Sequence, residues 1–134
     1  MLEISRINKT FNPGTINEKK ALDGLELHIR EGDFVTVIGG NGAGKSTLLN
    51  AICGVWKPDC GTVEIDGVDV TNMPDYKRAA YLGRVFQDPM MGTAATMQIE
   101  ENLALAARRG QPRTLRIGIT KAEREEYKEK LKIL

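Results

Sequence analysis

Residues 39–48 of this chain read Gly39-Gly40-Asn41-Gly42-Ala43-Gly44-Lys45-Ser46-Thr47-Leu48. They match the pattern Gly-x-x-x-x-Gly-Lys-Ser/Thr and directly follow the apolar run Phe34-Val35-Thr36-Val37-Ile38. A strand ending at Ile38 would lead into a loop whose glycines turn backbone N–H groups inward, just where a helix N-terminus favours an anion. The order of strand, loop and helix therefore predicts a nucleotide-binding phosphate loop in preference to a simple glycine-rich turn.

Each residue type of the loop has a predicted role at a nucleotide. Lys45 reaches the β- and γ-phosphates, Ser46 ligates Mg²⁺, and Thr47 donates to the α-phosphate side. The remaining contacts are predicted to come from the backbone of Gly39, Asn41, Gly42, Ala43 and Gly44.

Composition limits the class of protein. The chain has 134 residues, 41% of them hydrophobic and 28% charged, which is ordinary for one globular domain. No apolar stretch approaches the ~18 residues of a membrane helix, and residues 1–6 do not resemble a secretory signal, so we expect a cytosolic chain. The net charge of +1 predicts no nucleic-acid partner, and Arg108, Arg109, Arg113 and Arg116 fit solvated loop residues better than a binding patch.

Hydrophobic periodicity predicts the secondary structure. Strands are expected at residues 2–7, 25–29, 34–38, 62–67 with 68–70, and 82–86; helices are expected from about residue 44, at 74–80, at 97–109 and after Thr120. Three helices have predicted apolar faces: Leu48, Leu49, Ile52 and Val55; Ile99, Leu103 and Ala106; and Tyr127, Leu131 and Leu134. His28 is predicted to be a surface residue, and Cys53 and Cys60 to be structural, because neither belongs to a metal-ligand pattern.

Two further segments carry a family resemblance. Residues 59–67, Asp-Cys-Gly-Thr-Val-Glu-Ile-Asp-Gly, resemble the segment that follows the phosphate loop in ABC ATPases, and residues 85–89, Val-Phe-Gln-Asp-Pro, resemble their Q-loop. The resemblance implies an α/β fold, a P-loop NTPase of the ABC ATPase type. It divides the chain into an antiparallel β subdomain (1–33), a P-loop core with an incomplete parallel sheet (34–87), and the start of a helical subdomain (88–134).

The resemblance also implies site residues and cofactors. Phe11 resembles the aromatic residue that stacks on adenine, with a loop-edge hydrophobe as the alternative. Gln87 resembles the glutamine that touches Mg²⁺ and the attacking water, so Lys45 and Gln87 are the implied catalytic residues and Ser46 and Gln87 the metal contacts; a polar strand end is the alternative for Gln87. ATP and Mg²⁺ are the implied cofactors.

The implied partners are a transmembrane permease and a second ATP-binding subunit, with the protein peripheral at the inner face of the cell membrane. Residues 88–95, with Met90 and Met91, resemble the permease contact, and a flexible loop is the alternative. Residues 90–97 also resemble a bacterial subgroup found with small-solute uptake systems, which suggests aromatic amino acids as the solute.

Complete members of the family continue with a Leu-Ser-Gly-Gly-Gln signature, a Walker B strand ending in Asp-Glu and a switch histidine. None of these follows Gln87. The chain therefore resembles an N-terminal half, which leaves three functional hypotheses: part of a transporter's ATP-hydrolysing motor, a nucleotide- or partner-binding module without turnover, and a non-transport ABC protein. The near-neutral charge and single phosphate loop disfavour the third.

Overall fold

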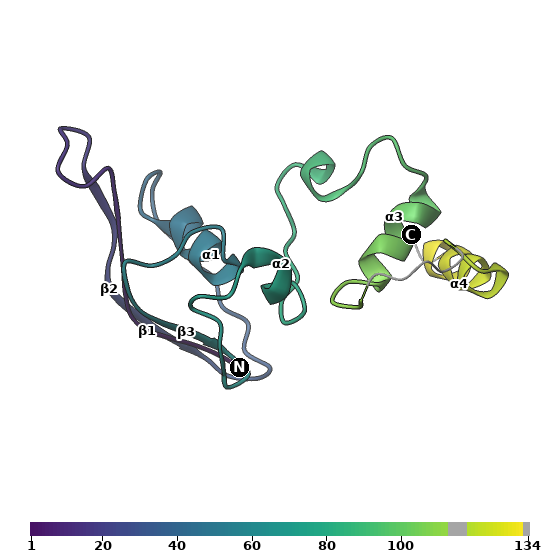
Figure 1. The fold of residues 1–134 in the computed structure, drawn as a ribbon, viewed down its shortest axis with the longest axis horizontal. Helices are drawn as coiled ribbons and strands as arrows, with labels where there is room; N and C mark the ends of the chain where they lie inside the picture. The colour runs from purple at the N-terminus through teal and green to yellow at the C-terminus, as the bar shows by residue number, and fades with distance from the viewer. Residues whose placement is uncertain (113–117, 133–134) are drawn as a thin grey trace. The chain divides into compact units, whose positions relative to one another are not determined.

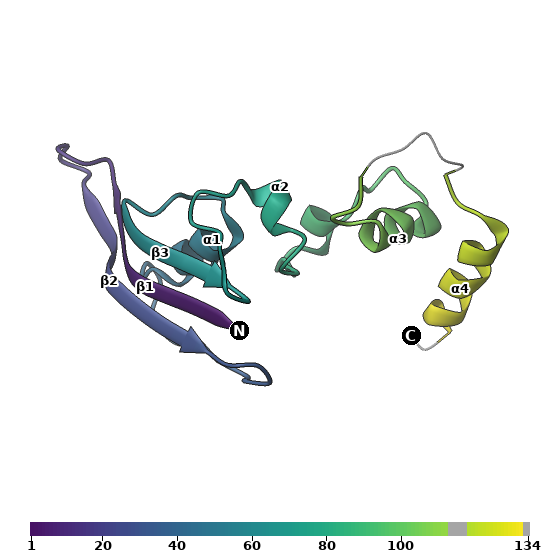
Figure 2. The ribbon, with the colours of Figure 1, turned by 60° about the horizontal axis from the view of Figure 1, so that its bottom comes forward.

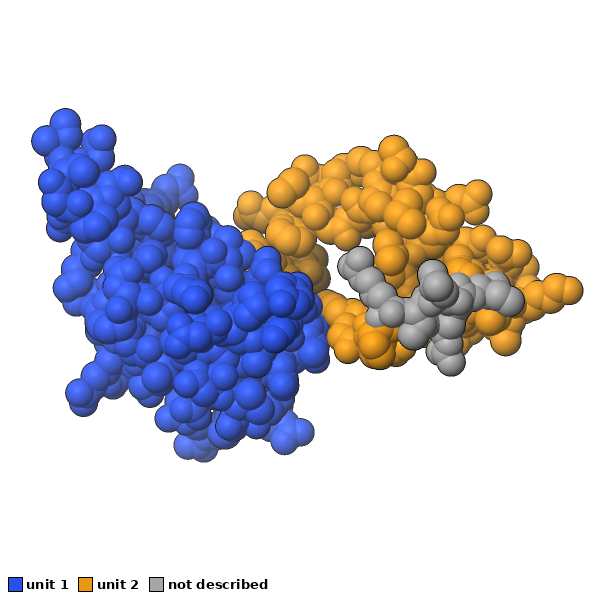
Figure 3. Space-filling view, in the orientation of Figure 1, with its two compact units in different colours: residues 1–82 blue, residues 83–134 orange. Residues whose placement is uncertain are grey.

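A computed structural model describes residues 1–112 and 118–132 of the chain. These residues form two compact units, Met1–Leu82 and Gly83–Leu134, which Figure 3 colours separately. The predicted three-part division of the chain, with boundaries after residues 33 and 87, stays a prediction.

The first unit is built on one antiparallel sheet of four strands in the order β2-β1-β3-β4. Figures 1 and 2 label the first three of these strands. The strands are β1 (Leu2–Phe11), β2 (Lys19–Ile29), β3 (Cys60–Ile65) and β4 (Val68–Asp69). The strands expected at residues 2–7, 25–29 and 62–70 are therefore confirmed in position. β1 and β2 run further than their alternating patterns because they pair with each other as far as Phe11 and Lys19.

Helix α1 (Lys45–Cys53) covers one face of this sheet and completes its core. Leu48 and Ala51 of the helix are buried together with Ile4, Ile7, Leu22, Val63, Ile65 and Val70. The expected apolar face of α1 is only partly correct, because Leu49 and Val55 are about half exposed. The shared core therefore packs the helix that follows the glycine loop against the sheet.

Two predicted strands are absent from the described residues. Residues 34–38 and 82–86 form no ladder, and the side chains of Phe34 and Ile38 are 95% and 89% exposed. A run of apolar residues becomes a strand only where a neighbouring strand satisfies its backbone N–H and C=O groups. The α/β class and the antiparallel sheet are thus confirmed, whereas the strand prediction for both segments is wrong in this structure.

A buried arginine fastens the end of α1 to the segment that follows the sheet. Arg78, the last residue of the short helix α2 (Asp75–Arg78), is fully buried. Its guanidinium donates hydrogen bonds of 2.7–2.9 Å to the carbonyls of Ala51, Ile52, Thr71 and Met73. Gly54, which ends α1 in the left-handed conformation at φ 82°, makes room for it.

The second unit holds a 3₁₀ turn (η1, Pro89–Gly92) and helices α3 (Ile99–Ala107) and α4 (Lys121–Leu131). The helices expected at 97–109 and after Thr120 are confirmed, and so is the capping box of Thr120 and Glu123. Tyr127 is buried as expected, but Ile99 and Ala106 are exposed, so the predicted apolar face of α3 is wrong. Leu134 lies outside the described residues.

Candidate phosphate-binding site

The loop of residues 39–44 takes a shape that favours glycine at two positions. Gly42 and Gly44 have φ angles of 81° and 87°, in the left-handed region that favours glycine. A Cβ atom on Gly44 would lie 2.5 Å from the carbonyl oxygen of Ala21 in β2. The loop therefore packs against β2 so closely that its last glycine has no room for a side chain.

The glycine loop leads into the N-terminus of helix α1, which no side-chain hydrogen bond from a described residue caps. Gly44 is the N-cap of α1, and no side chain among the described residues caps this end of the helix. The carbonyl of Gly44 accepts the N–H of Leu48 at 2.8 Å, so the N–H groups of the first turn have no partner within the helix. Unpaired donors and the positive end of the helix dipole make this end of α1 suited to an anion.

Two side chains of the predicted site lie at this helix end. The Lys45 ammonium donates hydrogen bonds to the carbonyls of Gly39 at 2.5 Å and Gly40 at 2.8 Å, so it folds back over the loop. Ser46 is exposed, and its hydroxyl is free to ligate a cation. The donor set consists of backbone N–H groups, an ammonium and a hydroxyl, which fits a polyphosphate with its metal ion.

Phe11 ends β1 in the same unit and contacts a second aromatic ring. Its ring lies edge-to-face on Trp56, with 5.2 Å between centroids and an interplanar angle of 81°. The Lys9 ammonium stands 5.8 Å from the Phe11 centroid. Trp56 follows α1, and the sequence analysis did not single it out because a lone tryptophan matches no motif. Phe11 is thus half-buried, with its ring in edge-to-face contact with Trp56. Base stacking on this ring stays a prediction.

Gln87 belongs to the second unit, where it is exposed just before η1. The Asp88 side chain caps that turn by accepting the N–H of Met90 at 2.9 Å. Met90 and Met91 follow with exposures of 61% and 69%. Because the loop and Gln87 lie in separate units, the predicted meeting of Gln87 with the metal and water at the loop stays a prediction.

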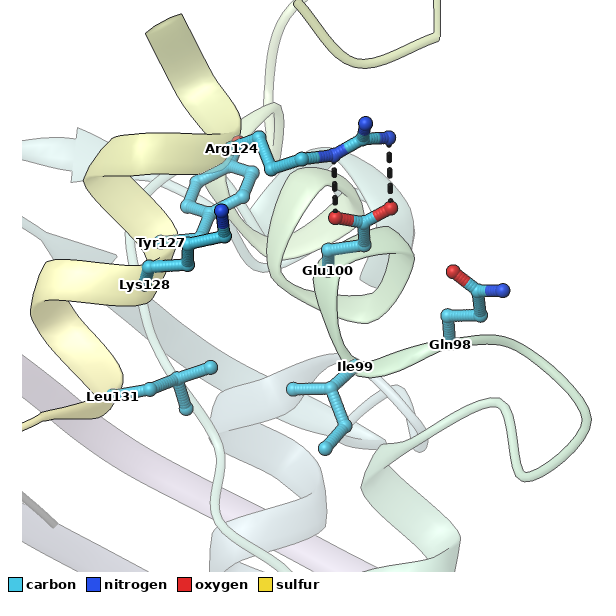
Figure 4. Close-up of a pocket in the computed structure, with 7 residues that line it drawn as sticks. All are labelled: Gln98, Ile99, Glu100, Arg124, Tyr127, Lys128 and Leu131. Atoms are coloured by element: carbon cyan, nitrogen blue, oxygen red, sulfur yellow. Dashed lines mark hydrogen bonds and ion pairs between the residues drawn. The ribbon is translucent and has the colours of Figure 1, made fainter. Parts of the chain in front are cut away.

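A groove of about 410 Å³ lies between α3 and α4 of the second unit (Figure 4). The Glu100 carboxylate and the Arg124 guanidinium at its rim pair through two hydrogen bonds of 2.8 and 2.9 Å. Its other lining residues are Gln98, Ile99, Tyr127, Lys128 and Leu131. None of the predicted nucleotide contacts lines it, and its charged pair is already neutralised, so it is not the phosphate site.

The other polar residues that the sequence points to form no metal-ligand group in the described part of the chain. Arg108 pairs with Glu123, and Arg113 and Arg116 lie outside the described residues. His28 is a half-exposed strand residue whose Nδ1 is 3.9 Å from the Glu3 carboxylate, and both cysteines are free thiols. Within residues 1–112 and 118–132, no group of three or more His, Cys, Asp or Glu side chains could hold a metal ion. No described helix has the length and apolar character needed to cross a membrane.

Curated proteins similar to this chain are ATP-binding proteins of transporters. The chain is 43% identical over 112 residues to the tyrosine transport ATP-binding protein of Clostridioides difficile, covering 83% of this chain and 44% of that protein. It is 30% identical to the bacitracin export ATP-binding protein BceA of Halalkalibacterium halodurans, over 98% of this chain and 49% of the relative. The chain thus spans about half the length of these relatives.

Solved structures and a family model agree with this similarity. The dimeric ATP-binding cassette MJ0796 bound to ADP and phosphate matches with a TM-score of 0.77 and 29% identity, over 98% of this chain and 56% of that one. The family model described as "ABC transporter" matches residues 22–134, which include the glycine loop, α1 and the segment around Gln87. The loop predicted from the sequence precedes the uncapped end of α1 and lies within the matched residues. The chain therefore belongs to the ABC transporter family.

Proposed function

We propose that this chain binds Mg-ATP as the N-terminal part of an ABC transporter ATP-binding subunit, which powers solute transport through a partner permease. The observation that carries the proposal is the uncapped N-terminus of α1, preceded by a glycine loop and holding the Lys45 ammonium. Members of the family bind adenine nucleotides, as the ADP-bound relative illustrates. The chemistry of the donors at this loop agrees with that ligand.

Each proposed contact follows from the position of a residue at the loop. The N–H groups of the loop and first helical turn would bind phosphate oxygens, and Lys45 would exchange its two carbonyl partners for the β- and γ-phosphates. The Ser46 hydroxyl would hold Mg²⁺, which neutralises charge on the phosphates when bound. Gln87, a residue of the second unit, would orient the attacking water. Lys45 and Gln87 are therefore the proposed catalytic residues, and Phe11 the proposed base contact.

The experiment that tests this proposal compares two lysine variants in calorimetry. Lys45→Ala should weaken Mg-ATP binding by at least about tenfold, since charge-assisted contacts dominate phosphate sites. Lys57→Ala removes the same charge from an exposed position of the same unit, and it should bind like the wild type. Equal affinity of wild type and Lys45→Ala would refute the nucleotide site.

The proposed partners are a transmembrane permease and a second ATP-binding subunit. Dimeric cassettes among the similar structures support the second subunit. For the permease contact we propose residues 88–95, where Met90 and Met91 present exposed apolar side chains on a capped turn. The alternative is that this turn is only a surface loop.

For the solute, the relatives favour small-molecule uptake. The tyrosine transport relative is 43% identical over 83% of this chain, whereas a ribose import relative of 44% identity covers 66% of it and the bacitracin export relative is 30% identical. We therefore propose aromatic amino acids as the solute class. Uptake of labelled tyrosine by cells that express the whole transporter tests this assignment, and its loss with Lys45→Ala would show that the uptake depends on the nucleotide site.

A further inference from the structure

Lys19 is the first residue of β2, and its ammonium lies beside the glycine loop. The Nζ atom is 3.1 Å from the point that a Cβ atom on Gly42 would occupy. The register of the sheet pairs Lys19 with Phe11 at the end of β1. One exposed cation thus adjoins the loop backbone and sits across the strand pair from the proposed base contact.

Two ammonium groups without a counter-charge lie at this short loop. The Lys45 ammonium bonds only to backbone carbonyls, and the Lys19 ammonium forms no ion pair or hydrogen bond with any residue that the structure describes. Like charges at one loop repel each other, and the donors of the loop and of α1 add partial positive charge. A bound polyanion would relieve this repulsion and gain from both lysines.

The neighbouring lysine, Lys20, differs from Lys19 in the pairing of its ammonium group. Lys20 carries the same charge at the next residue, but its ammonium is bound to the Asp23 carboxylate at 2.5 Å. Its charge is therefore already neutralised within β2. Of these two adjacent lysines, only Lys19 offers an unpaired ammonium at the loop.

We propose that Lys19 is a second cationic ligand of the nucleotide polyphosphate, acting beside Lys45. The proposal rests on the nucleotide site proposed above and deepens it, because it assigns part of the affinity for the phosphate tail to the first residue of β2. The phosphate-loop pattern covers residues 39–46 alone and gives no indication of this residue. Contact with Gly42 in the folded chain is the observation that assigns it.

The test compares Lys19→Met with the matched control Lys20→Met, using calorimetry with Mg-ATP and with inorganic tripolyphosphate. Lys19→Met should raise the Kd for both ligands by about threefold to fivefold, as expected for loss of one exposed charge pair. Lys20→Met should change either Kd by less than about twofold, and Lys19→Arg should stay near the wild type because it keeps the charge. Added salt should weaken the wild type more than Lys19→Met.

Three outcomes would count against the proposal. Equal Kd values for Lys19→Met and Lys20→Met would remove Lys19 from the site while leaving the Lys45 result intact. A loss for ATP without a loss for tripolyphosphate would place any contact on the nucleoside and contradict a phosphate role. Equal binding by wild type and Lys45→Ala would instead refute the nucleotide site itself, and the assignment of Lys19 with it.

Discussion

Arg78 is the largest fully buried side chain in the described residues, and its guanidinium is surrounded by main-chain carbonyls. Burial lowers the pKa of Arg78 from its ordinary value, and the nearby Cys53 and Asp69 partly oppose this shift. Arg78→Ala should reduce the free energy of unfolding by about 2–4 kcal/mol, because it leaves a cavity and removes the donors to α1 and to residues 71–73. Urea denaturation measures this difference.

The control for this variant is Lys77→Ala, the exposed neighbour on α2. It should change the unfolding free energy by no more than about 0.5 kcal/mol. If the two variants were equally stable, the four hydrogen bonds of Arg78 would not hold the end of α1. Gly54→Ala provides an independent check, because its Cβ would lie 2.8 Å from Arg78 Nε at a φ of 82°, and it should also destabilise the first unit.

Phe11 is the residue whose proposed role depends most on the family resemblance. Phe11→Ala should weaken ATP binding by about 1–3 kcal/mol, the range of base–aromatic stacking, and leave tripolyphosphate binding unchanged. Trp56 is the one tryptophan of the sequence and contacts the Phe11 ring, so its fluorescence should report nucleotide binding in the wild type. The exposed Tyr76→Ala serves as a control. Unchanged ATP affinity would favour a loop-edge hydrophobe.

Residue-level sequence reasoning located the loop residues where their spacing along the chain fixes their position, while their roles at a nucleotide stay a prediction. Lys45, Ser46 and the glycines lie at the helix end because their order in the pattern requires it. Arg78, Trp56 and Lys19 were missed, because each acquires its role from a partner about 23 to 45 residues away along the chain. Such contacts depend on packing, and no local sequence pattern predicts them.

At the scale of the elements, α4 is tied to α3 by its own capping box. The Glu123 carboxylate accepts the N–H of Thr120 at 2.7 Å, a bond from Arg108 at 2.9 Å and one from the Thr120 hydroxyl at 2.9 Å. Chiefly through the Thr120 N–H, and then Arg108, the pKa of Glu123 is lowered from 4.5 to about 2. The lowered pKa means that this carboxylate stabilises the second unit fully above about pH 4.5.

The expected pH dependence follows from the sign of that shift. Stability from Glu123 should be lost progressively as the pH falls from about 4.5 towards 2, because protonation removes the charge that these donors bind. Glu123→Gln should therefore lose less stability between pH 6 and pH 3 than the wild type, measured by urea unfolding followed by helical circular dichroism. Glu125→Gln is the control, since its carboxylate makes only an exposed pair with Lys128. An identical loss in wild type and Glu123→Gln would contradict the assignment.

The elements also show which patterns predict structure by themselves. Thr120 and Glu123 start a helix with contacts made inside a single turn, so the capping box predicted α4 correctly. The apolar run at residues 34–38 has the composition of a buried strand, but a strand needs partners from elsewhere in the fold. In the described residues that run has no ladder, and its apolar side chains are exposed. Local interactions were predictable, and pairing between distant segments was predictable only for the antiparallel strands.

At the scale of the whole molecule, the proposed phosphate site comes with few of the groups that hydrolysis needs. Phosphoryl transfer to water requires a held metal ion, a positioned water and charge stabilisation around the γ-phosphate. Lys45, Ser46 and Gln87 are proposed to bind and orient Mg-ATP. No apolar run ending in paired carboxylates follows Gln87 in the printed sequence, so these residues lack the base that the family resemblance calls for.

Three carboxylates that follow the loop in the sequence, Asp66, Asp69 and Asp88, are poor substitutes for that base. Asp66 is bound to the N-terminal ammonium, and Asp88 caps η1. Hydrogen bonds from Thr71 lower the pKa of Asp69, which makes it a weaker proton acceptor. Each carboxylate thus already accepts a hydrogen bond within its own unit.

We therefore expect the 134-residue chain to bind Mg-ATP without steady-state phosphate release above background. The longer tyrosine transport relative from Clostridioides difficile, assayed under the same conditions, is the positive control, because this chain covers only 44% of its length. Lys45→Ala separates turnover at the loop from a contaminating ATPase. Lys45-dependent phosphate release by the purified chain would show that a base is present among its own residues, and replacing Asp66, Asp69 and Asp88 by Asn one at a time would then identify it.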